Sequence, residues 1–143
     1  MDPQVGALLR MAWERLHTEL YDVLTAEGFG DLRPAHRPLV RYPGIDGLRP
    51  SELAEELRLS RQAVNDLLRD LEHMGYVELQ PDPNDGRARI IHYTDRGWRL
   101  LEASSRISGE IGERWAKEIG RRSFDGLVAA LRTIVALPED GAA

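Results

Sequence analysis

The sequence contains no cysteine among its 143 residues. This absence excludes disulfide bonds, thiolate zinc sites, iron–sulfur clusters and cysteine nucleophiles, and it excludes thiol oxidation as a regulatory signal. No run of about 18 apolar residues is present, so we expect no membrane-spanning helix. The N-terminal sequence MDPQVGALLR lacks the basic and then apolar segments of a secretory signal. We therefore expect a cytoplasmic protein that does not contact a membrane.

Positive charge is also scarce. The sequence has 19 Lys and Arg residues but 24 Asp and Glu residues, and its net charge is −5. Proteins that coat nucleic acid non-specifically are strongly basic, so this function is disfavoured. Even the segment 48–99 holds eight arginines against ten acidic residues. Any contact with nucleic acid must therefore come from a small local basic face. The length is typical of a single domain with one core, or of a pair of subdomains.

The sequence lacks the common motifs of catalysis. It has no glycine-rich phosphate loop, no nucleophile elbow and no His-Glu-x-x-His metal motif. Its four histidines (residues 17, 36, 73 and 92) lack the close spacing of a metal site. Asp82 and Asp85 lie in the turn-rich segment 81–86 and are interpreted as turn formers. We therefore expect no enzymatic activity, no cofactor and no metal.

Hydrophobic periodicity predicts a mainly α-helical chain with one β-hairpin. Apolar residues recur at steps of three and four, which is the spacing of one helical face. After Gly75 the pattern changes to the alternation of short strands on either side of a polar turn. Ser60, Thr94 and Ser123 are expected to cap helix starts. The expected helices are 5–27, 35–42, 50–57, 61–74, 95–120 and 123–137, and the expected strands are 76–79 and 88–93.

The middle of the chain has the element order of a winged helix-turn-helix. A short helix, a tight turn at Leu59-Ser60, a capped helix 61–74 and a hairpin follow one another. In such folds the N-terminus of the second helix enters the major groove of DNA, where side chains reach the base edges. Apolar residues form the inner face of helix 61–74, and the polar residues left outside are Arg61, Gln62, Asn65, Asp66 and Arg69.

These residue types fit the chemistry of a duplex. Glutamine and asparagine pair with adenine through two hydrogen bonds, and arginine pairs in the same way with guanine. Arg87 and Arg89 lie just past the hairpin tip, and an arginine on a projecting loop can enter a narrow minor groove. Asp85 is placed to orient Arg87 through a charge-assisted hydrogen bond.

Each of these residues, taken alone, is also an ordinary solvent-facing residue, and only their common face favours DNA contact. A winged helix that binds protein instead of DNA is the alternative function. It predicts an apolar exposed face on helix 61–74 and on the hairpin, whereas the sequence places polar residues and arginines there.

An ordered set of motifs spans the middle of the chain. The most specific is an Asp-Pro-x-Asp-x-Arg turn with Thr-x-x-Gly shortly after it. The motifs are Pro50-Ser51-Glu52-Leu53-Ala54, Leu59-Ser60, Leu71-Glu72-x-x-Gly75-Tyr76-Val77, Asp82-Pro83-Asn84-Asp85-Gly86-Arg87 and Thr94-Asp95-Arg96-Gly97. In this order and spacing the chain resembles MarR-type transcriptional regulators, and the resemblance covers nearly its whole length.

The resemblance implies a single MarR-type domain over 1–143, mainly α with a small β-hairpin wing. It implies a DNA-binding lobe at 31–94 and a helical dimerisation lobe at 1–30 and 95–143. It further implies a homodimer that acts on DNA, in most cases as a repressor. By motif position, the residues expected to bind DNA are Ser60 and Arg69 on phosphates, Arg61, Gln62 and Asn65 on bases, and Arg87 with its partner Asp85 on the wing.

The terminal helices support a dimer independently of the resemblance. Helices 5–27 and 123–137 each carry several large apolar residues, and a three-helix winged domain has no second face to bury both. Interlocking with a twin subunit would bury roughly 2,000 Å² or more. The alternative is that both helices fold back onto their own chain. A two-fold dimer predicts a pseudo-palindromic operator with half-sites about one helical turn apart.

Many MarR-like proteins release DNA when they bind a small aromatic or phenolic anion. The resemblance places such an effector pocket where the terminal helices meet the winged domain. The residues that could line it are Trp13, His17, Tyr21, His36 and Arg37, although each is more often a plain core or surface residue.

Overall fold

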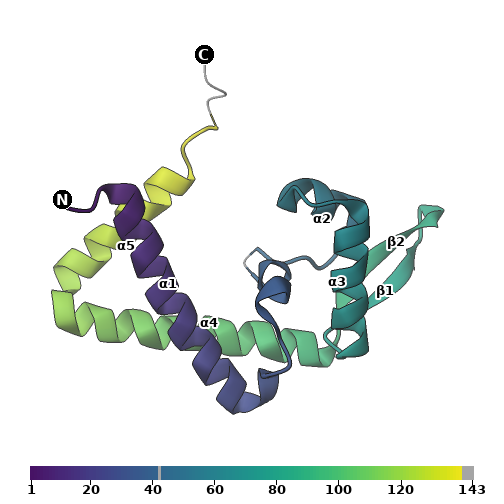
Figure 1. Ribbon diagram of the computed structural model, residues 1–143, viewed down its shortest axis with the longest axis horizontal. Coiled ribbons are helices and arrows are strands. Elements are labelled where there is room, and N and C mark those ends of the chain that lie inside the picture. Colours follow the sequence, from purple (N-terminus) through teal and green to yellow (C-terminus); the bar gives the residue numbers. More distant parts are fainter. Residues whose placement is uncertain (42, 140–143) are drawn as a thin grey trace. The chain divides into compact units, whose positions relative to one another are not determined.

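The computed structural model describes residues 1–41 and 43–139. It confirms a mainly helical chain with one two-stranded antiparallel sheet (Figure 1). The chain divides into two compact units, Met1–Ser105 and Arg106–Ala143, whose boundary lies inside a long helix. None of the helices in the described ranges is both long and apolar enough to cross a lipid bilayer.

The first unit contains the complete winged helix-turn-helix. Helix α1 is followed by a π-helical turn (η1), a short 3-10 helix (η2), two helices and a hairpin, and the unit ends with the start of α4. The bounds are α1 Val5–Leu24, η1 Thr25–Phe29, η2 Pro34–Leu39, α2 Pro50–Leu57, α3 Arg61–His73, β1 Val77–Asp82, β2 Asp85–Tyr93 and α4 Asp95–Ile119. The second unit holds the rest of α4 and helix α5, Arg121–Val135.

Several predicted boundaries are wrong. The expected helix 35–42 is a 3-10 helix that ends at Leu39, because Pro38 cannot donate an α-helical hydrogen bond; its predicted last residue, Tyr42, lies outside the described residues. The strands continue further into the turn than expected, through Asp82 and from Asp85, because a bulge accommodates the extra residues of β2. Ser123 does not cap the last helix, which begins two residues earlier after Gly120 with φ of 92°.

The turn between α2 and α3 is short and well defined. Arg58 ends α2 in the left-handed conformation with φ of 53°. The backbone N–H of Leu59 donates to the carbonyl of Ala54 at 3.0 Å, and Ser60 then begins the next helix. The two helices of the motif pack through side chains that are fully buried, among them Leu53, Val64 and Leu68.

The Thr-x-x-Gly motif joins the hairpin to the start of α4. The Thr94 hydroxyl donates to the carbonyl of Gly75 at 2.5 Å and accepts from the backbone N–H of Gly97 at 3.2 Å. A Cβ atom at Gly97 would lie 2.2 Å from the carbonyl oxygen of Tyr76 and 3.0 Å from Cδ1 of Tyr93. The motif therefore needs threonine at its first position to cap α4, and glycine at its last position because a larger side chain would not fit against Tyr76.

We predict that Gly97→Ala destabilises the protein by about 1–3 kcal/mol, because the methyl group forces the backbone of α4 away from Tyr76. The matched control is Gly109→Ala, also within α4, where a Cβ atom meets no atom within 4 Å. This control should raise stability by about 0.4–1 kcal/mol through chain entropy. Urea unfolding followed by circular dichroism measures both changes, and a Gly97→Ala protein as stable as the wild type contradicts the packing argument.

Candidate nucleic-acid interface

Helix α3 is built as an amphipathic helix with a capped N-terminus. The Ser60 hydroxyl oxygen accepts a hydrogen bond from the backbone N–H of Ala63 at 3.1 Å, as expected of an N-cap. Its own O–H remains a donor that could reach a phosphate. Val64, Leu68 and Leu71 are fully buried on the inner side. The predicted DNA-facing residues of this helix are all exposed: Arg61, Gln62, Asn65 and Arg69.

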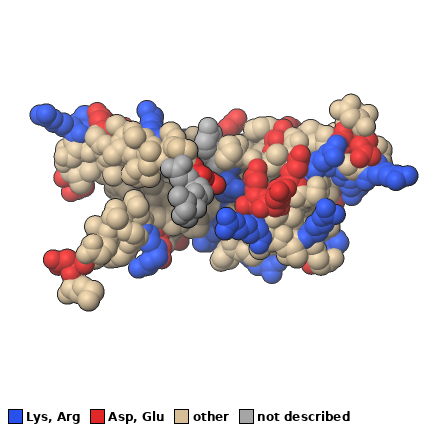
Figure 2. All heavy atoms as spheres, turned by 90° about the horizontal axis from the view of Figure 1, so that it is seen from above, with Lys and Arg blue, Asp and Glu red and all other residues tan. Residues whose placement is uncertain are grey.

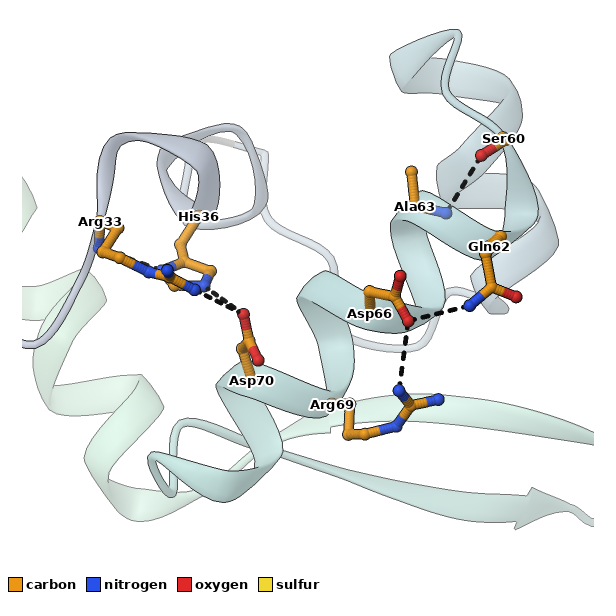
Figure 3. Close-up of polar contacts among 8 residues, drawn as sticks. All are labelled: Arg33, His36, Ser60, Gln62, Ala63, Asp66, Arg69 and Asp70. Atoms are coloured by element: carbon orange, nitrogen blue, oxygen red, sulfur yellow. Dashed lines mark hydrogen bonds and ion pairs between the residues drawn. The ribbon is translucent and has the colours of Figure 1, made fainter.

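The exposed face of α3 carries a network centred on Asp66 (Figure 3). The Nε2 atom of Gln62 donates to Oδ1 of Asp66 at 3.0 Å, and Nη1 of Arg69 donates to the same oxygen at 3.2 Å. The three side chains come from positions i−4, i and i+3, which lie next to each other on a helix surface. The carboxylate thus orients two of the residues that are predicted to bind DNA.

The other side of α3 is tied to η2 through Asp70. His36 is 1% exposed, and its Nε2 atom lies 3.1 Å from Oδ2 of Asp70 (Figure 3). Its Nδ1 atom accepts from the backbone N–H of Arg33 at 3.0 Å, so Nε2 carries the proton and donates to the carboxylate. The Arg33 guanidinium donates to the same carboxylate oxygen at 3.0 Å. His36 therefore connects η2 to α3 through Asp70.

The wing is fixed to the start of α2 by Asp82. This carboxylate is buried, accepts from Nη2 of Arg49 at 2.5 Å and accepts from the backbone N–H of Asn84 at 2.9 Å. Asp85 accepts from the backbone N–H of Arg87 at 3.0 Å, which is a turn-forming bond to the main chain rather than the expected bond to the guanidinium. The turn-forming role predicted for both aspartates is present in the structure.

The wing arginines are exposed, as the sequence predicts. Arg89 pairs with Pro81 across the hairpin, and Arg87 lies in the irregular part of β2 nearer the tip. Figure 2 shows basic side chains interspersed with acidic ones toward the end of the view where the hairpin lies. The basic face is therefore local and mixed, in agreement with the overall negative charge.

Four of the five predicted effector residues form one stacked group in the first unit. The rings of Trp13, His17 and Tyr21 follow each other along α1 with centroid distances of 4.8 and 4.7 Å. The Arg37 guanidinium lies over the Tyr21 ring, 4.0 Å from its centroid. Burial and the nearby Arg37 charge lower the pKa of His17, while burial raises the pKa of Tyr21.

One polar atom of this group has no partner. The Nε atom of Arg37 is buried and makes no hydrogen bond within the part of the chain that the structure describes. A buried donor without an acceptor is costly, and a bound anion is one way to satisfy it.

A second cluster, for which the sequence predicts no role, lies between the segment after η1, the start of the hairpin and α4. Tyr76 donates to Asp31, while Arg96 pairs with Asp31 at 3.0 Å and donates to the carbonyl of Met74. The Arg96 guanidinium lies 4.2 Å from the centroid of the Tyr76 ring. The only signal in the sequence is the position of Arg96 inside the Thr-x-x-Gly motif.

Comparisons with known proteins agree with this geometry. The sequence profile of the MarR family matches residues 39–88, which include α2, α3 and most of the hairpin. The transcriptional activatory protein BadR of Rhodopseudomonas palustris is 32% identical over 93 residues, or 63% of this chain and 50% of BadR. The HTH-type transcriptional repressor NicR of Pseudomonas putida is 28% identical over 116 residues, or 77% of this chain and 68% of NicR.

A solved structure extends the likeness over nearly the whole chain. The transcriptional repressor CouR, bound to a 23-mer DNA duplex, superposes with a TM-score of 0.67 and 25% identity, covering 92% of each chain. The family match over residues 39–88 and the shared fold support the assignment of this chain to the MarR family. MarR-family proteins are transcriptional regulators and not enzymes, which confirms the expectation drawn from the missing catalytic motifs. The matched segment spans about half the length of BadR.

The contact between η2 and α3 predicts a pH-dependent contribution to stability. The hydrogen bond from His36, together with the charge and hydrogen bond of Arg33, lowers the pKa of Asp70. A lowered pKa in the folded state stabilises the protein above the pKa of the unfolded chain, and this stability is lost as the pH falls through the folded value.

We therefore predict that Asp70→Asn is less stable than the wild type at about pH 7, and that the difference shrinks below about pH 4, where the unfolded aspartate takes up a proton. Urea unfolding curves of both proteins across this pH range measure the difference. A difference that stays constant from neutral to acidic pH contradicts the assigned role of the Asp70 charge.

Proposed function

We propose that this MarR-family protein is a sequence-specific DNA-binding transcriptional regulator that acts as a homodimer, and that it is a repressor. The observation that carries the proposal is the exposed polar face of α3 behind a capped N-terminus, with two exposed arginines on the adjoining wing. This face offers donors and acceptors for base edges, together with cations for phosphates.

The relatives support both parts of the proposal. CouR is a repressor that is seen on a DNA duplex, and NicR is named as a repressor, whereas BadR is named as an activatory protein. Repression is proposed because two of these three relatives carry that name. The alternative, a protein-binding winged helix, requires an apolar exposed face on α3, and the structure has charged and amide side chains there.

The proposed dimer is supported by apolar residues that the single chain leaves in water. On α1, Val5 and Trp13 are 71% and 59% exposed, and on α5, Ile134 is 55% exposed. Apolar faces of this kind are typical of surfaces that another chain covers. The alternative is that both terminal helices fold back onto their own chain, and the mass of the protein in solution distinguishes the two arrangements.

We further propose that a small aromatic or phenolic anion regulates the protein at the stacked group of α1 and η2. The rings of Trp13 and Tyr21 offer a stacking surface, and the buried Nε atom of Arg37 offers a donor without a partner in the described ranges. Aromatic surfaces beside a few polar groups are typical of small-molecule sites.

The experiment that tests DNA binding is selection of bound duplexes from a random pool with the purified protein. We expect a pseudo-palindrome with half-sites about one helical turn apart. For the selected operator, Arg87→Ala should weaken binding to all sequences and reduce the salt slope by about one unit per subunit, because each subunit loses one phosphate or groove contact.

The matched control is Lys117→Ala, which removes the same charge from an exposed position on α4, outside the winged helix. This control should leave the salt slope unchanged. If Arg87→Ala and Lys117→Ala behave alike, the wing does not contact DNA. If selection recovers no common sequence, the proposed function is wrong.

The proposed dimer predicts that charge on the apolar face of α5 separates the subunits. We expect the wild type to sediment with the mass of two chains and a Leu131→Asp, Ile134→Asp variant with the mass of one. The control is Thr133→Asp, because Thr133 lies on the opposite side of the same helix and is also exposed. A single-chain mass for the wild type, or a two-chain mass for the double variant, contradicts the interface.

A further inference from the structure

Asp66 is unusual because it places a negative charge in the middle of the face proposed to meet DNA. Its side chain is about half exposed, and a carboxylate there repels the phosphates of an approaching duplex. The inner face of α3 does not need it, since Val64 and Leu68 provide the packing. Because Asp66 is not needed for packing and its charge opposes DNA binding, we examine whether it helps the protein to distinguish one DNA sequence from another.

The contacts of Asp66 fix the direction of the Gln62 amide. Because Nε2 of Gln62 donates to Oδ1 of Asp66 at 3.0 Å, the carbonyl oxygen of Gln62 and one remaining N–H are left for another partner (Figure 3). Without this contact the amide could rotate and present either its oxygen or its nitrogen. The carboxylate thus favours one of two possible hydrogen-bonding patterns at the helix surface.

The same carboxylate acts on Arg69. The guanidinium Nη1 donates to Oδ1 of Asp66 at 3.2 Å, which holds the cation close to the helix and offsets part of its charge. An arginine that is already paired with a carboxylate gains less binding free energy from a DNA phosphate than an unpaired arginine does. This pairing weakens binding that does not depend on sequence.

We propose that Asp66 is a specificity-determining residue of the DNA-binding face. It orients Gln62 so that the amide oxygen accepts from an exocyclic amino group in the major groove, and it reduces attachment to phosphates without a matching sequence. Adenine N6 and cytosine N4 are the amino groups exposed in that groove, and the remaining N–H of Gln62 favours adenine, whose N7 accepts. The proposal rests on the proposed function as a DNA-binding regulator.

Two substitutions separate the two effects. Asp66→Asn removes the charge but keeps an amide oxygen that can accept from Gln62, whereas Asp66→Ala removes both. The charge control is Asp22→Asn, an exposed aspartate on α1. Alanine has a higher helix propensity than aspartate, so the Asp66→Ala helix is expected to fold, and circular dichroism verifies this.

The measurement is the affinity of each protein for the selected operator, for a scrambled duplex and for operators changed at each half-site position, over a range of salt concentrations. Both Asp66 variants should bind the scrambled duplex about 3- to 10-fold more tightly at low salt, since a repulsive charge is gone. Asp22→Asn should change this affinity less. Only Asp66→Ala should lose preference at one position per half-site, by about 5-fold or more.

The outcomes distinguish the two proposals. If the wild type prefers its operator and Asp66→Ala keeps every base preference, the role of Asp66 is wrong while the DNA-binding function stands. If Asp66→Asn strengthens binding to the scrambled duplex no more than Asp22→Asn does, the charge effect is wrong. If the wild type binds operator and scrambled duplex equally, both the function and the role of Asp66 are overturned.

Discussion

The structure of the winged helix depends on the burial of one side of α3. Val64, Leu68 and Leu71 are fully buried at the spacing of one helical face, so the opposite face has to point to solvent. Fixed attachments then prevent the helix from turning. Ser60 caps its first turn, and Asp70 is held by the buried His36. The burial of the apolar residues therefore determines which polar side chains of α3 are exposed to solvent.

Charge pairing explains how an acidic protein can present a basic face. Several arginines of the first unit are paired within it: Arg33 with Asp70, Arg49 with Asp82, and Arg96 with Asp31. These ion pairs join segments that are far apart in the sequence. They therefore stabilise the fold of the first unit and add little to the positive electrostatic potential at its surface. In the proposed regulator, the charge available to a duplex comes from a few exposed arginines on each of the two subunits.

The sequence predicted the element order, the capped start of α3 and the exposure of the wing arginines, because periodicity and capping are local. It did not predict the length of the strands, since the bulge near Asp85 depends on pairing across the hairpin. The role of Asp82 was only partly foreseen: its turn is local, but its bond to Arg49 joins residues 33 positions apart. The bond between His36 and Asp70 was not foreseen for the same reason, because the two residues are distant in the chain.

Two neighbouring residues of η2 face different parts of the first unit. Arg37 lies over the Tyr21 ring of α1, and His36 bonds Asp70 of α3. Because η2 is only six residues long and both side chains are anchored, a shift of its backbone at Arg37 also displaces His36. A ligand that drew Arg37 toward itself would therefore act on α3 through a single short segment. Coupling of this kind needs no long pathway, since the two contacts are one peptide bond apart.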